Sequence, residues 1–135
     1  MKKLFSSKYS DHSISFSLLL LRLSLGGLMI HHGFDKLQHF AARSGTFTDP
    51  FHIGGPASMS LTIFAEFFCA IFILLGLMTR LACIPLIVAM SVAVFISHKG
   101  QVTGNGEHAA LFLAGYLALL FAGPGKISMD RLIGK

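Results

Sequence analysis

The chain has 135 residues, of which 53% are hydrophobic and 13% are charged, and its formal net charge is +5. A soluble domain carries about 25% charged residues, so this composition excludes an ordinary water-soluble protein and predicts an integral membrane protein in a lipid bilayer. The lysines and arginines lie near segment ends without an aromatic-and-basic stripe, so they indicate topology-setting charges rather than a nucleic-acid partner.

The first apolar segment spans residues 14–39 and follows a basic N-terminal stretch. Arg22 interrupts its apolar core, and no small-residue cleavage site follows cleanly. We therefore interpret the segment as a retained transmembrane helix rather than a signal peptide.

One face of this helix carries both its buried charge and its small residues. At about 100° per residue, the residues that share this face are Arg22, Gly26, Met29, Gly33 and Lys36. Glycines allow a neighbouring helix or a flat ligand to approach closely. We expect this face to point into a helix bundle, with His32 at its edge and His31 on the opposite side.

Three further apolar segments follow, at residues 57–78, 81–97 and 107–122. Turn residues separate them, and the sequence GPGK ends the last one. Crossing the hydrocarbon core takes about 20 residues, so the last two segments are short for a full crossing. The sequence predicts an all-α protein, a transmembrane four-helix bundle formed by a single domain over residues 1–135.

The positive charges predict the orientation of the bundle. Seven lysines and arginines fall on the side of the N-terminus, and three (Lys36, Arg43 and Lys99) fall on the other side. Cytoplasmic loops carry the excess of lysine and arginine. We therefore expect a multi-pass protein of the inner (cytoplasmic) membrane with both termini in the cytoplasm.

Arg22 and Glu66 both lie at depths where lipid penalises charge. An unpaired charge there costs about 2.5–3.5 kcal/mol on insertion scales. Counted from the inner ends of their helices, Arg22 lies roughly 12 Å deep and Glu66 roughly 16 Å deep. This similarity predicts an Arg22–Glu66 contact, which could be a structural ion pair or the polar floor of an intramembrane ligand pocket.

Several polar residues are expected at the outer ends of the helices. We predict that His32 and Lys36 join Glu107 and His108 around one polar cavity that opens toward the outer face. Two alternatives are histidines that only anchor the interface and a transition-metal site that also uses His98. No HxxxH or HxxE spacing on one helix supports the metal, so we expect none.

Three stretches, in this order, resemble the DoxX-like family of small four-helix membrane proteins. They are LLRLSLGGLMIHHGFDKL, FAEFFCAIFILLGLMTRLA and GEHAALFLAGYLALLFAGPGKISMD. Some members of that family are similar to subunits of membrane oxidoreductases, including the small subunit of a thiosulfate:quinone oxidoreductase. The resemblance implies that Arg22, Lys36, Glu66 and Glu107 are polar pocket residues.

The leading functional hypothesis is a quinone-binding membrane subunit or one associated with a redox complex. The chain has no CxxCH motif, dinucleotide fingerprint or cluster-binding cysteines, so no intrinsic cofactor is expected, and a redox group would come from quinone or a redox protein partner. One alternative is a structural or assembly subunit without a ligand. Another is a small-solute transporter, which at this size would need to form a homo-oligomer.

Overall fold

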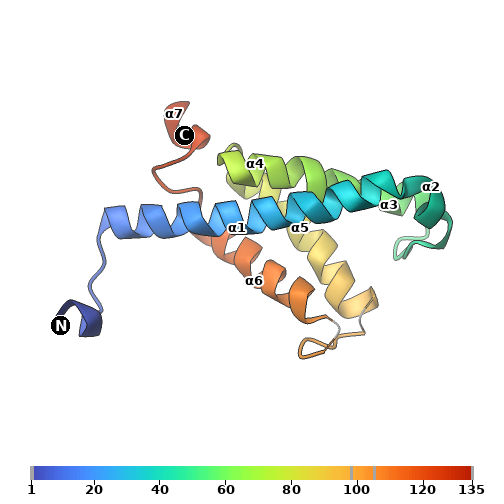
Figure 1. The fold of residues 1–135 in the computed structure, drawn as a ribbon, viewed down its shortest axis with the longest axis horizontal. Coiled ribbons are helices and arrows are strands. Elements are labelled where there is room, and N and C mark those ends of the chain that lie inside the picture. The colour runs from blue at the N-terminus through green and yellow to red at the C-terminus, as the bar shows by residue number, and fades with distance from the viewer. Residues whose placement is uncertain (1, 98, 105, 135) are drawn as a thin grey trace.

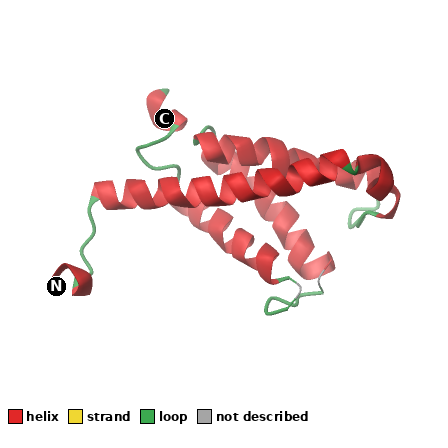
Figure 2. Cartoon of the chain, in the orientation of Figure 1, coloured by secondary structure: helices red, strands yellow, loops and turns green. Residues whose placement is uncertain are grey.

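The computed structural model describes residues 2–97, 99–104 and 106–134, which form helices and connecting loops without a β-strand (Figures 1 and 2). The first rod is α1 (Asp11–Gln38), and the second joins α3 (Gly55–Ile63), the π-helical η3 (Phe64–Cys69) and α4 (Ala70–Leu75). The third joins α5 (Thr79–Val92) and the π-helical η4 (Ala93–Ser97), and the fourth is α6 (Glu107–Ala122). Short helices complete the described chain: η1 (Lys2–Phe5), α2 (Phe40–Arg43), η2 (Ser44–Thr46) and α7 (Met129–Leu132).

Among the described residues, three rods are long and apolar enough to cross a membrane: Asp11–Gln38, Gly55–Leu75 and Thr79–Ser97. The helix Glu107–Ala122 is apolar but shorter. The predicted fold class, an all-α membrane bundle, is confirmed. The first helix begins at Asp11, three residues before the expected residue 14, and the second ends at Leu75 rather than at residue 78.

The glycine face of α1 packs against the second rod. A Cβ atom on Gly26 would lie 2.9 Å from the carbonyl oxygen of Ala70, and one on Gly33 would lie 2.7 Å from the carbonyl carbon of Glu66. Gly27, on the other side of α1, has no such neighbour within 4 Å. Because Arg22, Gly26, Met29 and Gly33 are all buried, the predicted inward face of α1 is confirmed.

The apolar core fills the space where α1, the second rod, α5 and α6 meet (Figure 1). Tyr116 of α6 is fully buried there, and its hydroxyl donates a hydrogen bond of 3.2 Å to the carbonyl oxygen of Leu25. A buried phenol needs such a partner, so this bond fixes α6 against α1. The other large, fully buried residues of this core are Met29, Ile73, Leu86 and Leu119.

Gly76 ends the second rod. Its φ of 71° is left-handed, which favours glycine, and the N–H of Leu77 donates 2.9 Å to the carbonyl oxygen of Phe72. This is the helix end called a Schellman motif. The chain therefore reverses within a few residues, and α5 begins at Thr79 beside the end of α4.

Candidate functional site

Lys36 and Glu66 form an ion pair between α1 and η3. Lys36 Nζ lies 2.5 Å from Glu66 Oε2, and the two side chains are 23% and 6% exposed. The pair is possible because Gly33, one turn before Lys36, brings the backbones of α1 and η3 into close contact. The predicted Arg22–Glu66 contact is therefore wrong, because the partner of Glu66 is Lys36.

Arg22 is held by main-chain carbonyl groups instead. Its Nε donates 3.1 Å to the oxygen of Ile73, and Nη2 donates 3.3 Å to that of Leu74. Nη1 donates 2.8 Å to the oxygen of Pro124 and 2.5 Å to that of Ile127. The last carbonyls of a helix lack intrahelical partners, so Arg22 satisfies the end of α4 and binds the C-terminal segment to it.

The wrong pairing came from an assumption about helix ends. The depths were counted as if the inner ends of the first two helices were level. In the structure the first turns of α1 extend past the end of α4 (Figure 1), so Arg22 lies level with Leu74. Glu66 is eight residues before Leu74, roughly 12 Å farther along the rod.

Asp130 fastens the same end of the bundle. Its carboxylate accepts hydrogen bonds from the N–H groups of Met78 (2.7 Å) and Thr79 (3.0 Å), where α5 begins. Its own N–H donates 2.9 Å to the carbonyl oxygen of Gly76. We call Arg22, residues 73–79 and residues 124–130 the clasp. Sequence reasoning missed Asp130, although aspartate is a preferred capping residue.

The Lys36–Glu66 pair lines a cavity of about 500 Å³. The other walls come from the loop after α2, from α3 and η3, and from α5 and η4. These walls are mostly apolar, and their residues are Phe47, Thr48, Pro50, Phe51, Ser58, Leu61, Thr62, Phe64, Ala65, Pro85, Val88, Ala89, Val92, Ala93 and Ser97. We call this space the Lys36–Glu66 cavity.

The π-helical turn η3 positions the acidic residue of the cavity. In a π-helix the hydrogen bond runs from residue i to i+5, and such turns occur often at functional sites. The turn Phe64–Cys69 buries Ala65, Glu66 and Cys69. Glu66 therefore faces both α1 and the cavity from a locally irregular part of the rod.

Asp49 organises the loop that covers part of the cavity. Its carboxylate accepts hydrogen bonds from the N–H groups of Ile53 (3.0 Å) and Gly54 (2.8 Å) and from the hydroxyl of Ser58 (2.8 Å). The bond from Ser58 is the main cause that lowers the pKa of Asp49, the two backbone bonds add to it, and desolvation opposes it. Across the cavity, the Ser97 hydroxyl lies 3.3 Å from that of Thr48.

The aromatic residues of this loop were also missed. The turn residues between the first two apolar segments, GTFTDPFHIGGP, predict only a connection between two helices, yet Phe47 and Phe51 of this stretch line the cavity. Two phenylalanines in an otherwise polar connection were the available signal, because such a loop has little other reason to carry large apolar side chains.

The remaining predicted site residues lie elsewhere. His32 packs edge-on against Phe112 of α6, with ring centroids 6.1 Å apart, and Glu107 and His108 are exposed at the start of α6. None of the three lines the cavity that holds Lys36. The structure therefore does not gather these four residues around that cavity, and a ligand-binding role for His32, Glu107 and His108 remains a prediction.

His98 lies outside the described residues. Within the described part of the chain, no three histidine, cysteine, aspartate or glutamate side chains are placed to hold a metal ion.

Comparison with known proteins gives a family match and two membrane relatives. The family model for DoxX matches residues 17–99. The chain is 31% identical to the uncharacterized membrane protein Rv3486 of Mycobacterium tuberculosis H37Rv, over 88% of this chain and 82% of the relative. It is 34% identical to the inner membrane protein YphA of Escherichia coli K12, over 92% and 96% respectively. No solved structure matches the chain significantly.

Proposed function

This chain belongs to the DoxX family of membrane proteins, and we propose that it binds a quinone in the Lys36–Glu66 cavity as the membrane subunit of a redox complex. The observation that carries the proposal is one close ion pair in the wall of a largely apolar cavity of about 500 Å³. Ligand pockets commonly measure about 300–1,000 Å³ and combine apolar walls with few polar groups.

The donor set fits a flat molecule with carbonyl groups. Lys36 carries a positive charge that can donate a hydrogen bond to a quinone oxygen, and Glu66 can accept or give a proton. Phe47, Phe51 and Phe64 offer flat apolar surfaces to the ring. When bound, the quinone would supply the two-electron chemistry of its own ring, and its electrons would come from a redox protein partner.

The chain's own residues would bind and orient this ring. Lys36 already holds Glu66 at 2.5 Å, so an incoming carbonyl oxygen would share the ammonium group with the carboxylate. The loop organised by Asp49 would keep water from the apolar part of the cavity. Arg22 has no part in this proposal, because its donors are used by main-chain carbonyls.

The test is quinone binding by protein reconstituted in lipid nanodiscs. Purified protein should carry co-extracted quinone, and it should bind added decyl-ubiquinone or a short-chain menaquinone. Lys36→Met should weaken quinone binding about tenfold, since a hydrogen bond to a charged group contributes about 1.5–3 kcal/mol. Glu66→Gln should act mainly on the quinol, whose hydroxyl can donate to the carboxylate, and should weaken quinol binding by a similar factor.

Asp35→Asn is the matched control. It breaks another ion pair, between Asp35 of α1 and Arg43 of α2 at 2.9 Å, and neither residue lines the cavity. The quinone affinity of this variant should stay within about twofold of that of the unchanged protein. A tenfold change would correspond to about 1.4 kcal/mol. Equal quinone affinity in all variants, or no quinone bound at all, would favour a subunit without a ligand.

A further inference from the structure

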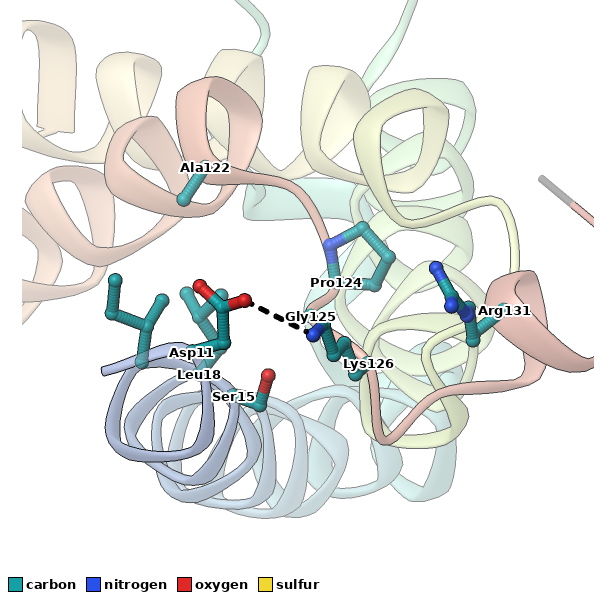
Figure 3. Close-up of a pocket in the computed structure, with 9 residues that line it drawn as sticks. Asp11, Ser15, Leu18, Ala122, Pro124, Gly125, Lys126 and Arg131 are labelled. Atoms are coloured by element: carbon teal, nitrogen blue, oxygen red, sulfur yellow. Dashed lines mark hydrogen bonds and ion pairs between the residues drawn. The ribbon is translucent and has the colours of Figure 1, made fainter.

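A second cavity lies at the opposite end of α1 from the first. It measures about 300 Å³ and lies between the first turns of α1 and the segment that follows α6 (Figure 3). Ser15 in its wall is 21 residues before Lys36, roughly 31 Å along a helix. The two cavities are therefore separate, and the inference below does not depend on quinone binding.

The rim of this cavity carries an excess of positive charge. Two cations, Lys126 and Arg131, and one acid, Asp11, line it, and Asp11 Oδ2 lies 3.2 Å from Lys126 Nζ. The side chain of Asp11 is 75% exposed and that of Lys126 is 52% exposed. Exposed ion pairs of this kind are weak. Lysine has three donors, so Lys126 can keep Asp11 and bind a second anion.

Arg131 is available for an anion. Within the described part of the chain, its backbone N–H bonds Ser128 Oγ, but its guanidinium makes no hydrogen bond or ion pair. The planar guanidinium matches the geometry of a phosphate and can bind it through two parallel hydrogen bonds. The hydroxyl-bearing Ser15 also lines the wall, as Figure 3 shows.

The other half of the cavity is apolar. Its wall contains Ile14 and Leu18 of α1 and Ala122 at the end of α6. Apolar side chains continue beyond it on the outside of the bundle, where Ile14 is 38% exposed and Phe121 is 80% exposed. A free inorganic anion would leave this half unused, whereas a lipid would place its acyl chains there.

We propose that this cavity binds an anionic glycerophospholipid, with its phosphate between Lys126 and Arg131 and its acyl chains along α1 and α6. The excess positive charge favours a lipid with net negative charge over a zwitterionic one, whose ammonium group would be repelled. The lipid would bridge α1 and the segment before α7, so it would also stabilise the clasp from outside.

The experiment is a native mass-spectrometry titration of the full chain with phosphatidylglycerol and with phosphatidylcholine of the same acyl chains. Phosphatidylglycerol should bind about tenfold more tightly than phosphatidylcholine, a difference of about 1.4 kcal/mol. The double variant Lys126→Gln/Arg131→Gln should bind the two lipids equally. The control Lys8→Gln/Arg80→Gln removes two positive charges from the same end, outside the cavity, and should keep the preference.

A second measurement needs no variant. Phosphatidylglycerol with a photoreactive acyl chain should label residues 11–18 and 117–122. Three results would each overturn the assignment: equal loss of preference in both double variants, labelling spread over all helices, or inorganic phosphate displacing the lipid at equal concentration. The last result would assign the site to free phosphate.

Discussion

The two cations on the inward face of α1, Arg22 and Lys36, are treated differently by the fold. Arg22 donates to four main-chain carbonyls of the clasp, whereas Lys36 meets one carboxylate beside a cavity. Carbonyl groups cannot change protonation or be exchanged for a ligand without opening the main chain. One of these two charges is therefore held by the main chain, whereas the other is paired with a side chain in the wall of a cavity, which is the arrangement that the proposed binding site uses.

The largest effect should come from replacing Arg22. Arg22→Met leaves carbonyl oxygens of α4 and the C-terminal segment without donors, and one buried unsatisfied group costs about 1–3 kcal/mol. We expect a loss of about 3 kcal/mol or more in the free energy of unfolding, measured by denaturation in mixed detergent micelles. Arg22→Lys should recover little of it, because one ammonium group cannot replace a planar fork of five donors.

Glu66→Gln is the paired variant in that experiment. Glutamine can still accept a hydrogen bond, and Lys36, which is 23% exposed, can extend its charge toward the interface. We therefore expect a loss of about 1–2 kcal/mol, smaller than that of Arg22→Met. If Glu66→Gln proved more destabilising than Arg22→Met, the assignment of structural and binding roles would be reversed.

An intermediate effect is expected at the glycine next to the ion pair. Gly33→Ala would place a methyl group 2.7 Å from main-chain atoms of Glu66 and Phe67. Overpacking of this kind costs about 1–3 kcal/mol, and the widened helix contact should also weaken quinone binding.

Gly27→Ala is the matched control for this overpacking. Its methyl group meets open space, so the variant should gain about 0.5–1 kcal/mol from helix propensity. Thermal unfolding of both variants measures the difference. Equal behaviour of Gly33→Ala and Gly27→Ala would show that α1 and η3 do not pack this closely.

The smallest effect is a local pH dependence in the loop over the cavity. The folded pKa of Asp49 is lowered from its ordinary value of 3.8, first by the Ser58 hydroxyl bond. Its contribution to loop stability is therefore complete above the unfolded pKa and is lost as the pH falls through the folded pKa, below pH 3.8. Amide hydrogen exchange of Ile53 and Gly54 should accelerate in that range, and Asp49→Asn should remove the step.

The helices and their inward face could be predicted from the sequence because both depend on local pattern. The hydrophobic segments and the spacing of Gly26 and Gly33 follow from helix periodicity. The partner of Glu66 could not be predicted in this way, because it depends on how far α1 slides along the second rod. That offset is set by the close helix contacts at Gly26 and Gly33 and by the hydrogen bonds of the clasp. These are contacts between residues far apart in the sequence, so a local pattern does not encode them.

The candidate cavity was only partly predictable for a related reason. Lys36 and Glu66 were identified as polar pocket residues, but the loop with Phe47 and Phe51 was assigned no role. A loop has no hydrophobic period, so its position follows from specific bonds such as those of Asp49. His32 was grouped with Lys36 by its angle on α1 and by its level, and Glu107 by level alone. Neither criterion determines which neighbouring helix a side chain meets, and His32 packs against Phe112 of α6.

The π-helical turn η3 makes the number of residues in the second rod as important as their chemistry. It accommodates one residue more than a regular turn would. Because η3 takes up this residue, the two halves of the rod keep nearly the phase of a continuous α-helix that is one residue shorter. If the same six residues, Phe64–Cys69, were wound as a regular α-helix, the two halves would rotate by about 100° relative to each other. In such a regular helix, Ile73 and Leu74 could stay beside Arg22 only if Glu66 turned away from Lys36. The number of residues in this rod therefore sets the rotational angle between the face that meets Arg22 and the face that meets Lys36.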